Sequence, residues 1–416
     1  MANACGVDFG TSNSTVGWSR AGKAGLLALE DAKTTLPSVV FFNADDDAVS
    51  FGRAALADYL AGYEGRLMRS LKSLLGSSLI DGQTEVQGRA LPFRDLLAQF
   101  IGELKRRAEQ AAGRHFSQAV FGRPVFFVDD DPAADRLAEN TLAEIARSVG
   151  FSEIAFQFEP IAAAFDYESQ ISREELVLIA DIGGGTSDFS LVRLAPERAG
   201  IADRRRDILA TGGIHIGGTD FDKYLSLSSV MPLLGLGTQL LNGNEVPSSY
   251  YFNLATWHTI NLAYTQKVWR ELEDVYRDAR ERERLALLLK LIEQRDGHWL
   301  ALQVEAGKIA LSDAQATALR LDRLAAGTSL ELTRPGFDDA IMHLCSGVEN
   351  TVAGLLRNAG ITVDRIDTVF FTGGSSGVHL LRQKIAQLVP EARRVEGDLF
   401  GSIGVGLGLD AHRKFG

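Results

Sequence analysis

The stretches Asp8-Phe-Gly-Thr-Ser12 and Asp181-Ile-Gly-Gly-Gly-Thr186 decide the fold of this chain of 416 residues. They lie about half the chain apart, and each follows an apolar run that predicts a β-strand. In each, an aspartate closes the strand, glycines permit a tight turn with bare backbone N–H groups, and a hydroxyl residue ends the turn. Such loops bind phosphate oxygens. Two facing loops would hold a polyphosphate and leave two carboxylates for a hydrated divalent cation, so the simplest ligand is Mg-ATP.

The composition is that of a globular protein with two or more packed units. Hydrophobic residues make up 45% of the chain, and 43 Lys and Arg against 54 Asp and Glu give a formal charge of −11. A surface of that sign repels nucleic acid and anionic membranes, so we expect neither as a partner. Cys5 and Cys345 are too few for a disulfide framework, and the amino terminus has no export signal, so we expect a cytoplasmic protein.

The predicted elements alternate between strands and helices, which favours the α/β class. Gly6 to Phe9 and Thr15 to Trp18 predict a hairpin whose tip is the first loop. Ala119 to Val128 predicts a further strand, and Asp131-Pro132 then opens a helix with an N-cap carboxylate and a proline at its first position. Tyr224 to Asn244 has no charged residue, but Pro232 and its glycines predict a buried helix and a loop, not a membrane span.

The second half of the chain repeats this plan. Leu176 to Ala180 and Phe189 to Leu194 predict a second hairpin, and Arg365 to Thr372 predicts a late strand that ends in a glycine pair. The largest insertion runs from Asp222 to about Leu300, and its centre, Trp269 to Arg295, predicts one long helix with interleaved charges. The halves are therefore interpreted as copies of one fold with different insertions.

Seven segments in this order resemble the nucleotide-binding domain of the seventy-kilodalton heat-shock chaperones, the DnaK type, within the actin and sugar-kinase superfamily. The two loops resemble the family's phosphate motifs, and all seven segments occur in the family's order. The segments are Val7 to Ser14, Thr35-Leu-Pro-Ser38, Phe158-Glu-Pro-Ile-Ala-Ala-Ala164, Leu178 to Asp188, Gly213 to Asp222, Val304 to Ser312 and Phe371-Thr-Gly-Gly-Ser375. One glycine-rich loop is weak evidence, but seven ordered segments are strong.

The resemblance implies a duplicated actin-like (ribonuclease H-like) ATPase fold of the α/β class, with two lobes around a nucleotide cleft. Lobe I would comprise residues 1–169 and lobe II residues 170–397, with a helical insertion at about 222–310. Residues 398–416 would form a helix that returns to lobe I. Neither an interdomain linker nor a peptide-binding domain follows Gly416 in this sequence, so we expect an architecture similar to the YegD-type short homologues.

The resemblance also implies roles at the reaction centre. Asp8 and Asp181 would bind waters of the magnesium shell, and Lys72 would stabilise the nucleophile and the transferring phosphoryl group. Glu159 would lie near the metal and the attacking water, the alternative being a solvent-facing glutamate before a proline. The implied catalytic residues are Lys72, Glu159, Asp181, Thr186 and Asp188, with Asp188 beside the water and Thr186 near the terminal phosphate.

The remaining implied residues bind ATP or ADP, with Mg²⁺ and possibly K⁺ as cations. Phosphate contacts would come from Gly10, Thr11, Ser12, Asn13, Gly183, Gly184, Gly185 and Thr186. The other nucleotide-binding positions would be Gly217, Gly218, Glu305, Lys308, Ser312, Gly373, Gly374, Ser375 and Asp398, where Glu305, Lys308 and Ser312 hydrogen-bond ribose and base and Asp398 opens the returning helix.

Two positions depart from the family pattern. Ile309 and Gly377 stand where the family has arginines that flank the adenine. Arginine stacking contributes about 0.5 to 2 kcal/mol per contact, so their loss predicts nucleotide binding weaker by roughly tenfold unless Ile309 and Val378 compensate.

Three functions remain open from the sequence. The first, which we favour, is a switch that binds and slowly hydrolyses Mg-ATP and signals to a protein partner or client. The second is a small-molecule kinase of the same superfamily. The third is an actin-like protein whose filaments depend on ATP. The chaperone-type Glu159-Pro motif and the segment around Lys72 argue against the kinase.

Overall fold

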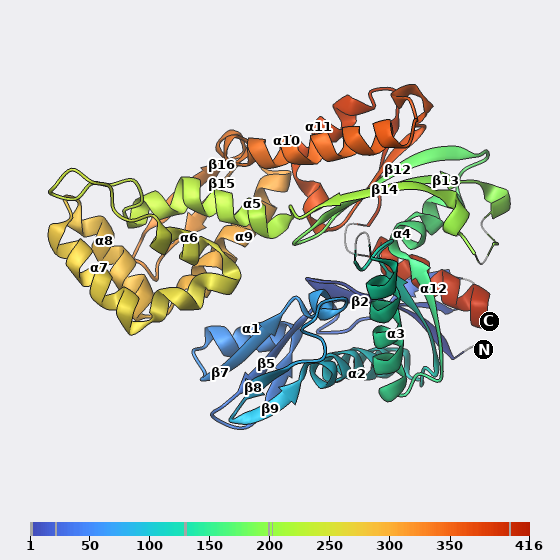
Figure 1. Ribbon diagram of the computed structural model, residues 1–416, viewed down its shortest axis with the longest axis horizontal. Helices are drawn as coiled ribbons and strands as arrows, with labels where there is room; N and C mark the ends of the chain where they lie inside the picture. Colours follow the sequence, from blue (N-terminus) through green and yellow to red (C-terminus); the bar gives the residue numbers. More distant parts are fainter. Residues whose placement is uncertain (1–2, 21–22, 129–130, 199, 202, 399–400) are drawn as a thin grey trace. The chain divides into compact units, whose positions relative to one another are not determined.

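The structure is a computed structural model that describes residues 3–20, 23–128, 131–198, 200–201, 203–398 and 401–416, with the side chains of Lys23 and Asp166 left out. The chain forms two compact units (Figure 1). Unit 1 comprises residues 1–213, 351–376 and 386–416, and unit 2 comprises residues 214–350 and 377–385. Asp129 and Asp130 of the acidic triplet lie outside the described residues. Both phosphate loops belong to unit 1.

Two sheets of unit 1 repeat the same strand pattern. The first has the order β11-β10-β1-β2-β3, with β4 also on β2, and the second has the order β14-β13-β12-β17-β18. In each, an antiparallel hairpin (β1/β2 or β12/β13) continues on its first strand into two parallel strands. The strands are β1 Ala4–Phe9, β2 Asn13–Arg20, β3 Lys23–Leu26, β4 Thr35–Pro37, β10 Gln118–Arg123, β11 Glu153–Phe158, β12 Glu175–Ile182, β13 Ser187–Leu194, β14 Ile208–Ile214, β17 Thr368–Thr372 and β18 Arg393–Glu396. The predicted duplication is therefore visible strand by strand.

Side chains alternate between the two faces of a sheet, and both faces of the first sheet carry apolar side chains that helices cover. Cys5, Val7 and Phe9 of β1 pack with α2 and α3, whereas Ala4 packs with α4 and α12. The second core also takes in β12, β13 and β17, so α4 and α12 serve both sheets. The helices of unit 1 are α1 Gly52–Leu60, α2 Phe93–Ala112, α3 Pro132–Ser148, α4 Glu159–Glu168 and α12 Ser402–Phe415. Its small sheets are formed by β5 Val39–Asn43, β6 Val49–Phe51 and β7 Gly65–Arg69, and by β8 Gln83–Val86 and β9 Arg89–Pro92.

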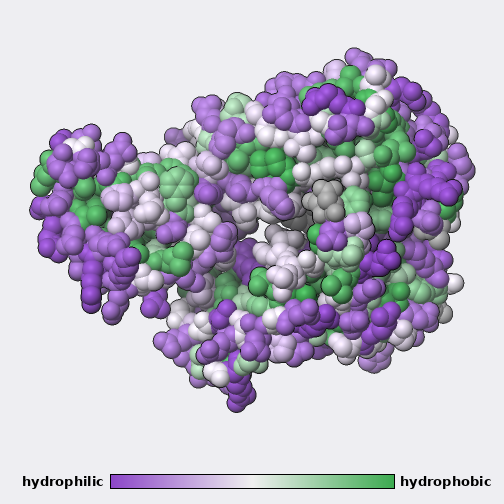
Figure 2. Space-filling view, viewed as in Figure 1, coloured by the Kyte–Doolittle hydropathy of each residue, from purple (hydrophilic) through white to green (hydrophobic). Residues whose placement is uncertain are grey.

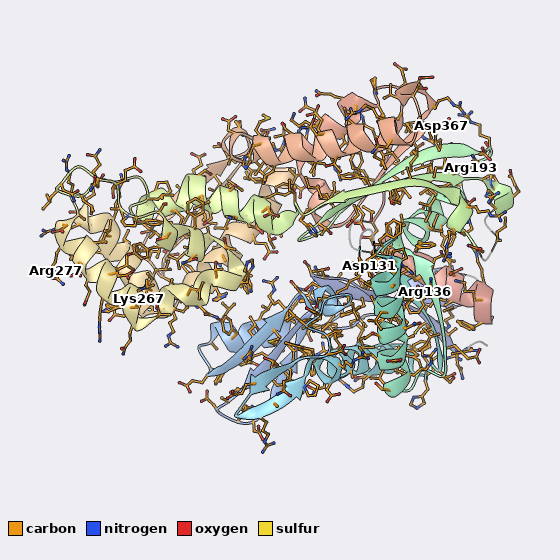
Figure 3. All side chains as sticks on the ribbon, viewed as in Figure 1. Asp131, Arg136, Arg193, Lys267, Arg277 and Asp367 are labelled. Atoms are coloured by element: carbon orange, nitrogen blue, oxygen red, sulfur yellow. The ribbon has the colours of Figure 1, made fainter. Side chains whose placement is uncertain are left out.

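Unit 2 is mainly helical. Its helices are α5 Gly218–Leu225, α6 Ser249–Ala255, α7 Gln266–Asp278, α8 Arg282–Glu293 and α9 Gly297–Asp313, with the hairpin β15 Ala316–Arg320 and β16 Ser329–Thr333. Helices α10 Arg334–Asn358 and α11 His379–Leu388 contribute residues to both units. Hydrophilic side chains cover the exposed side of α7 (Figure 2), and Lys267 and Arg277 point outward from it (Figure 3). No helix in the described part of the chain is long and apolar enough to cross a bilayer.

The predicted hairpins, and the helix capped by Asp131, are confirmed. Asp131 accepts from the N–H groups of Ala133 and Ala134, and Pro132 is the first residue of α3 (Figure 3 labels Asp131). The predicted strand at Ala119 to Val128 is too long, because β10 ends at Arg123, directly before Pro124, which has no N–H to donate. The late strand also begins later than predicted, at Thr368, after a 3₁₀ turn at Val363–Arg365.

The prediction of one long helix from Trp269 to Arg295 is wrong. Helix α7 ends at Asp278 and α8 begins at Arg282, because the chain between them pairs with the segment after α5. Ala279 bridges to Leu240, and the N–H of Arg280 donates to the carbonyl of Gln239. Leu240 is 39 residues away, so the local charge pattern does not contain this contact.

Helix α12 packs on the first sheet through glycines. A Cβ atom at Gly406 would overlap the carbonyl oxygen of Ala162 in α4, and one at Gly408 would lie 2.8 Å from the carbonyl carbon of Gly17 in β2. Backbone atoms cannot move aside as a side chain can, so these glycines set how closely α12 approaches.

We expect Gly406→Ala to destabilise the protein by about 1–3 kcal/mol, because the added methyl group forces α12 away from α4. Gly354→Ala in α10 is the matched control, because its Cβ would meet only the Arg357 side chain, at 3.9 Å. The control should be neutral or more stable by up to about 1 kcal/mol. Urea unfolding followed by circular dichroism measures both variants. Equal midpoints for the two variants would contradict the packing described for α12.

Candidate functional site

The first phosphate loop is the tip of the β1/β2 hairpin. A Cβ atom at Gly10 would overlap the carbonyl oxygen of Asn13, so the turn is too tight for any other residue. Ser38 closes the loop: its hydroxyl donates to the Gly10 carbonyl at 2.7 Å, and its N–H donates to the Ser12 carbonyl at 2.9 Å. Sequence reasoning did not assign Ser38 to the site, although the Thr35-Leu-Pro-Ser38 segment was a signal for it.

The second loop meets the first. A Cβ atom at Gly184 would overlap the hydroxyl oxygen of Ser12 and lie 3.2 Å from its Cβ, whereas one at Gly185 would meet nothing within 4 Å. Gly373, at φ +83°, approaches from the end of β17, where a Cβ would overlap the Asp181 carboxylate. The structure thus brings together three glycine-bearing turns that are distant in sequence.

Lys72 and Glu159 form an ion pair beside these loops. The Lys72 ammonium lies 2.5 Å from Glu159 Oε1, although 87 residues separate them. Glu159 is only 9% exposed, so the alternative of a solvent-facing glutamate is wrong. Burial opposes the charge of Lys72, but the charges of Glu159 and Asp8 outweigh it and raise the pKa of the lysine.

The two loop aspartates carry more negative charge than Lys72 offsets. Burial, reinforced by the Glu159 charge, raises the pKa of Asp8 to about 7. Burial, followed by the charges of Asp188, Glu159 and Asp8, raises the pKa of Asp181 to about 8. The carboxylates therefore lie close enough for the charge of one to raise the pKa of another. This crowding favours a positive ligand between them.

Thr186 and Asp188 complete the second loop. The Thr186 hydroxyl donates to Asp188 at 2.8 Å, and the Gly183 N–H donates to the Thr186 carbonyl at 2.9 Å. Asp188 lies opposite Asp181 in the β12/β13 register and is exposed. Its carboxylate is therefore accessible from solvent next to the half-buried Asp181.

The residues expected to bind the nucleoside fall into two groups. Glu305, Lys308 and Ser312 share one face of α9, and Lys308 donates to the Gly218 carbonyl at 3.0 Å and to Asp222 at 2.9 Å. These residues, with Gly217 as the N-cap of α5, belong to unit 2. Sequence reasoning did not assign Asp222, although it ends the Gly213 to Asp222 segment. Gly373, Gly374, Ser375 and Asp398 belong to unit 1, where Ser375 is buried and Asp398 is exposed before α12.

The oxygen donors at the loops fit a hydrated magnesium ion. Magnesium prefers hard oxygen ligands and retains several waters, so two carboxylates and the phosphates of a nucleotide suffice. Over the described residues, no three or more His, Cys, Asp or Glu side chains gather closely enough to hold a metal directly. Any magnesium would therefore depend on water and phosphate oxygens as well as on Asp8 and Asp181.

The profile of the family described as "Hsp70 protein" matches residues 4–229 and 292–398. The chain belongs to the Hsp70 family. Members of this family are ATPases with the duplicated actin-like fold, so the predicted family and fold class are confirmed, as the strand-by-strand repeat already indicates.

Among curated relatives, the chain is similar to the chaperone protein HscA of Citrobacter koseri (26% identical) and of Escherichia coli (25%). It is also similar to the HscA homologue of Shewanella piezotolerans (27% identical). Each alignment covers 98% of this chain and 58% of the relative. The chain thus spans less than two thirds of the length of these chaperones.

We expect Asp181→Asn to stabilise the protein in buffer without magnesium or nucleotide. The folded state raises the pKa of Asp181, so its charged form costs stability at every pH above its ordinary pKa of 3.8, and the cost increases up to about pH 8. If the substitution removes a tenfold change in the proton affinity of this group, the free energy of unfolding rises by about 1.4 kcal/mol. Thermal unfolding at pH 7.5 measures the effect. Arg277→Ala on α7 is the control and should leave the midpoint unchanged; a lower midpoint for Asp181→Asn would contradict the charge crowding.

Proposed function

We propose that the chain binds Mg-ATP and hydrolyses it slowly, as the nucleotide switch of a chaperone-type protein. The observation that carries this proposal is the close approach of Gly184 to Ser12 beside the Lys72–Glu159 ion pair. Two amide-lined turns at this separation suit one polyphosphate, and the carboxylates of Asp8 and Asp181 suit the cation that accompanies it.

In this proposal, each side chain has a role that its surroundings support. The amides of both loops bind phosphate oxygens, and Asp8 and Asp181 bind waters of the magnesium ion. Lys72, oriented by Glu159, stabilises negative charge on the transferring phosphoryl group, while Asp188, held by Thr186, orients the attacking water. Magnesium would supply charge neutralisation and orientation of the phosphates.

We further propose adenine as the base, bound less firmly than in relatives with flanking arginines. Ile309 is 57% exposed on α9, beside the face that carries Glu305, Lys308 and Ser312. An exposed apolar side chain gives the base a contact surface but no cationic stacking.

We also propose a protein partner or client, because the curated relatives are chaperones by name. Family membership favours this function over a small-molecule kinase or an actin-like filament.

Phosphate release by the purified protein tests the proposal directly. The parent protein should hydrolyse Mg-ATP slowly, and Lys72→Ala should reduce kcat at least about tenfold, because the cation at the transferring group is lost. Lys267→Ala removes an exposed lysine of α7 and should have no effect. A folded parent protein without activity above the blank, or equal rates for Lys72→Ala and the parent, would contradict the proposed ATPase.

A pair of glycine substitutions tests whether the two loops bind the same phosphate chain. Gly184→Ala should weaken Mg-ATP binding by about tenfold, because its methyl group displaces Ser12 and separates the loops. Gly25→Ala in β3 is the control and should bind normally, because its Cβ would meet nothing within 4 Å and it lies outside both loops. Isothermal titration calorimetry gives both affinities. Equal affinities in the two variants would show that the contact with Ser12 does not matter for binding.

A further inference from the structure

Arg123 is a buried cation that the proposed mechanism does not use. It ends β10 and is 7% exposed. Its guanidinium forms ion pairs with Asp135 at 2.8 Å and with Glu139, both on α3. The same group donates to the carbonyls of Pro124, at 3.0 Å, and Val125, at 3.1 Å. One side chain therefore ties the segment after β10 to α3.

The first connection runs from Arg123 to Glu159. Arg123 pairs with Phe158 in the β10/β11 register, and its guanidinium lies 5.4 Å from the centre of the Phe158 ring. Phe158 directly precedes Glu159. The neighbouring Gly122 lies against the glutamate, because a Cβ there would be 3.2 Å from Glu159 Cγ and 3.4 Å from Oε1. The end of β10 is thus the surface on which the Glu159 side chain rests.

The second connection runs to Lys72. Lys72 lies in a 3₁₀ turn, Leu71–Leu74, followed by Gly76 at φ +78°. A Cβ at Gly76 would overlap the Val128 side chain and lie 3.6 Å from the Phe127 carbonyl. Asp135 accepts the Phe127 N–H at 2.6 Å, and Arg123 lies 5.2 Å from the centre of the Phe127 ring. The turn that carries Lys72 therefore rests on the segment that Arg123 and Asp135 hold.

We propose that Arg123 is a positioning residue that fixes the distance and orientation of the Lys72–Glu159 ion pair. Its planar fork binds two carboxylates and two carbonyls at once, which a lysine ammonium cannot do with the same geometry. Arg123 acts through Phe158 on one partner of the pair and through Phe127 and Val128 on the other. This inference rests on the proposed function only for its effect on turnover, because the ion pair itself is independent of nucleotide.

The first test measures the chemical reactivity of Lys72. In Arg123→Lys, the rate of Lys72 acylation by an amine-reactive ester should rise at least about threefold, because a loosened ion pair frees the amine. Mass spectrometry gives the rate, and Lys308, buried against Asp222 in unit 2, is the internal reference. A purely structural role would raise both rates together through general unfolding, and an unchanged Lys72 to Lys308 ratio would overturn the proposal.

The second test separates turnover from binding. In Arg123→Lys, kcat should fall about tenfold while KM for Mg-ATP stays within about twofold. Arg94→Ala is the matched control, because Arg94 also pairs with α3, through Glu144, but at the surface. The control should leave kcat unchanged. A normal kcat in folded Arg123→Lys would overturn the proposal.

Glu139→Gln keeps the test decisive if Arg123→Lys does not fold. It removes one partner of the fork, lies partly exposed and leaves Asp135 in place. In Glu139→Gln, the rate of Lys72 acylation should again rise and kcat should again fall, each by at least about twofold. If Glu139→Gln changed neither the Lys72 acylation rate nor kcat, the proposal would be overturned. A parent protein without ATPase activity would refute the proposed function alone, since the Lys72 labelling ratio still decides the role of Arg123.

Discussion

The close approach of two hairpin tips is the constraint on which the rest of the site depends. Gly184 lies so near Ser12 that any side chain at 184 would overlap the serine hydroxyl. Each tip belongs to one of the two sheets that share the same strand pattern. In both sheets the hairpin is antiparallel, and its first strand continues into parallel strands. Helix α12, packed through glycines on the first sheet, and α4 fill the core that both sheets share. The packing of unit 1 therefore determines where the two loops lie, and their glycines allow each loop to turn tightly.

The charges at the two loops determine which kind of ligand the site favours. Asp8, Glu159 and Asp181 lie close enough for each charge to affect the others, and Lys72 is the cation paired with them at 2.5 Å from Glu159. A protein gains no stability from like charges held close together, so this arrangement fits a ligand that brings positive charge with it. Magnesium bound to a nucleotide is such a ligand, and its phosphates would face the bare amides of both loops.

Much of the site could be predicted from the sequence because its signals are local. The glycine-rich turns, the strands before them and the order of the seven segments need no knowledge of distant contacts. Contacts between distant residues were missed: Ser38 closing the first loop, Asp222 holding Lys308, and Arg123 binding α3 and the segment after β10. The break between α7 and α8 was missed for the same reason, because Leu240 pairs with Ala279 across the segment that contains α6 and α7. Such contacts arise from packing and leave no periodic pattern in the sequence.

A double-mutant cycle on the two loop aspartates tests the central claim most directly. Calorimetry would measure the affinity for ATP, with and without magnesium, for the parent, Asp8→Asn, Asp181→Asn and the double variant. If both carboxylates serve one cation between the loops, each single change removes most of the magnesium dependence and the double change removes little more. Additive losses from the two substitutions, as expected of independent sites, would contradict the account.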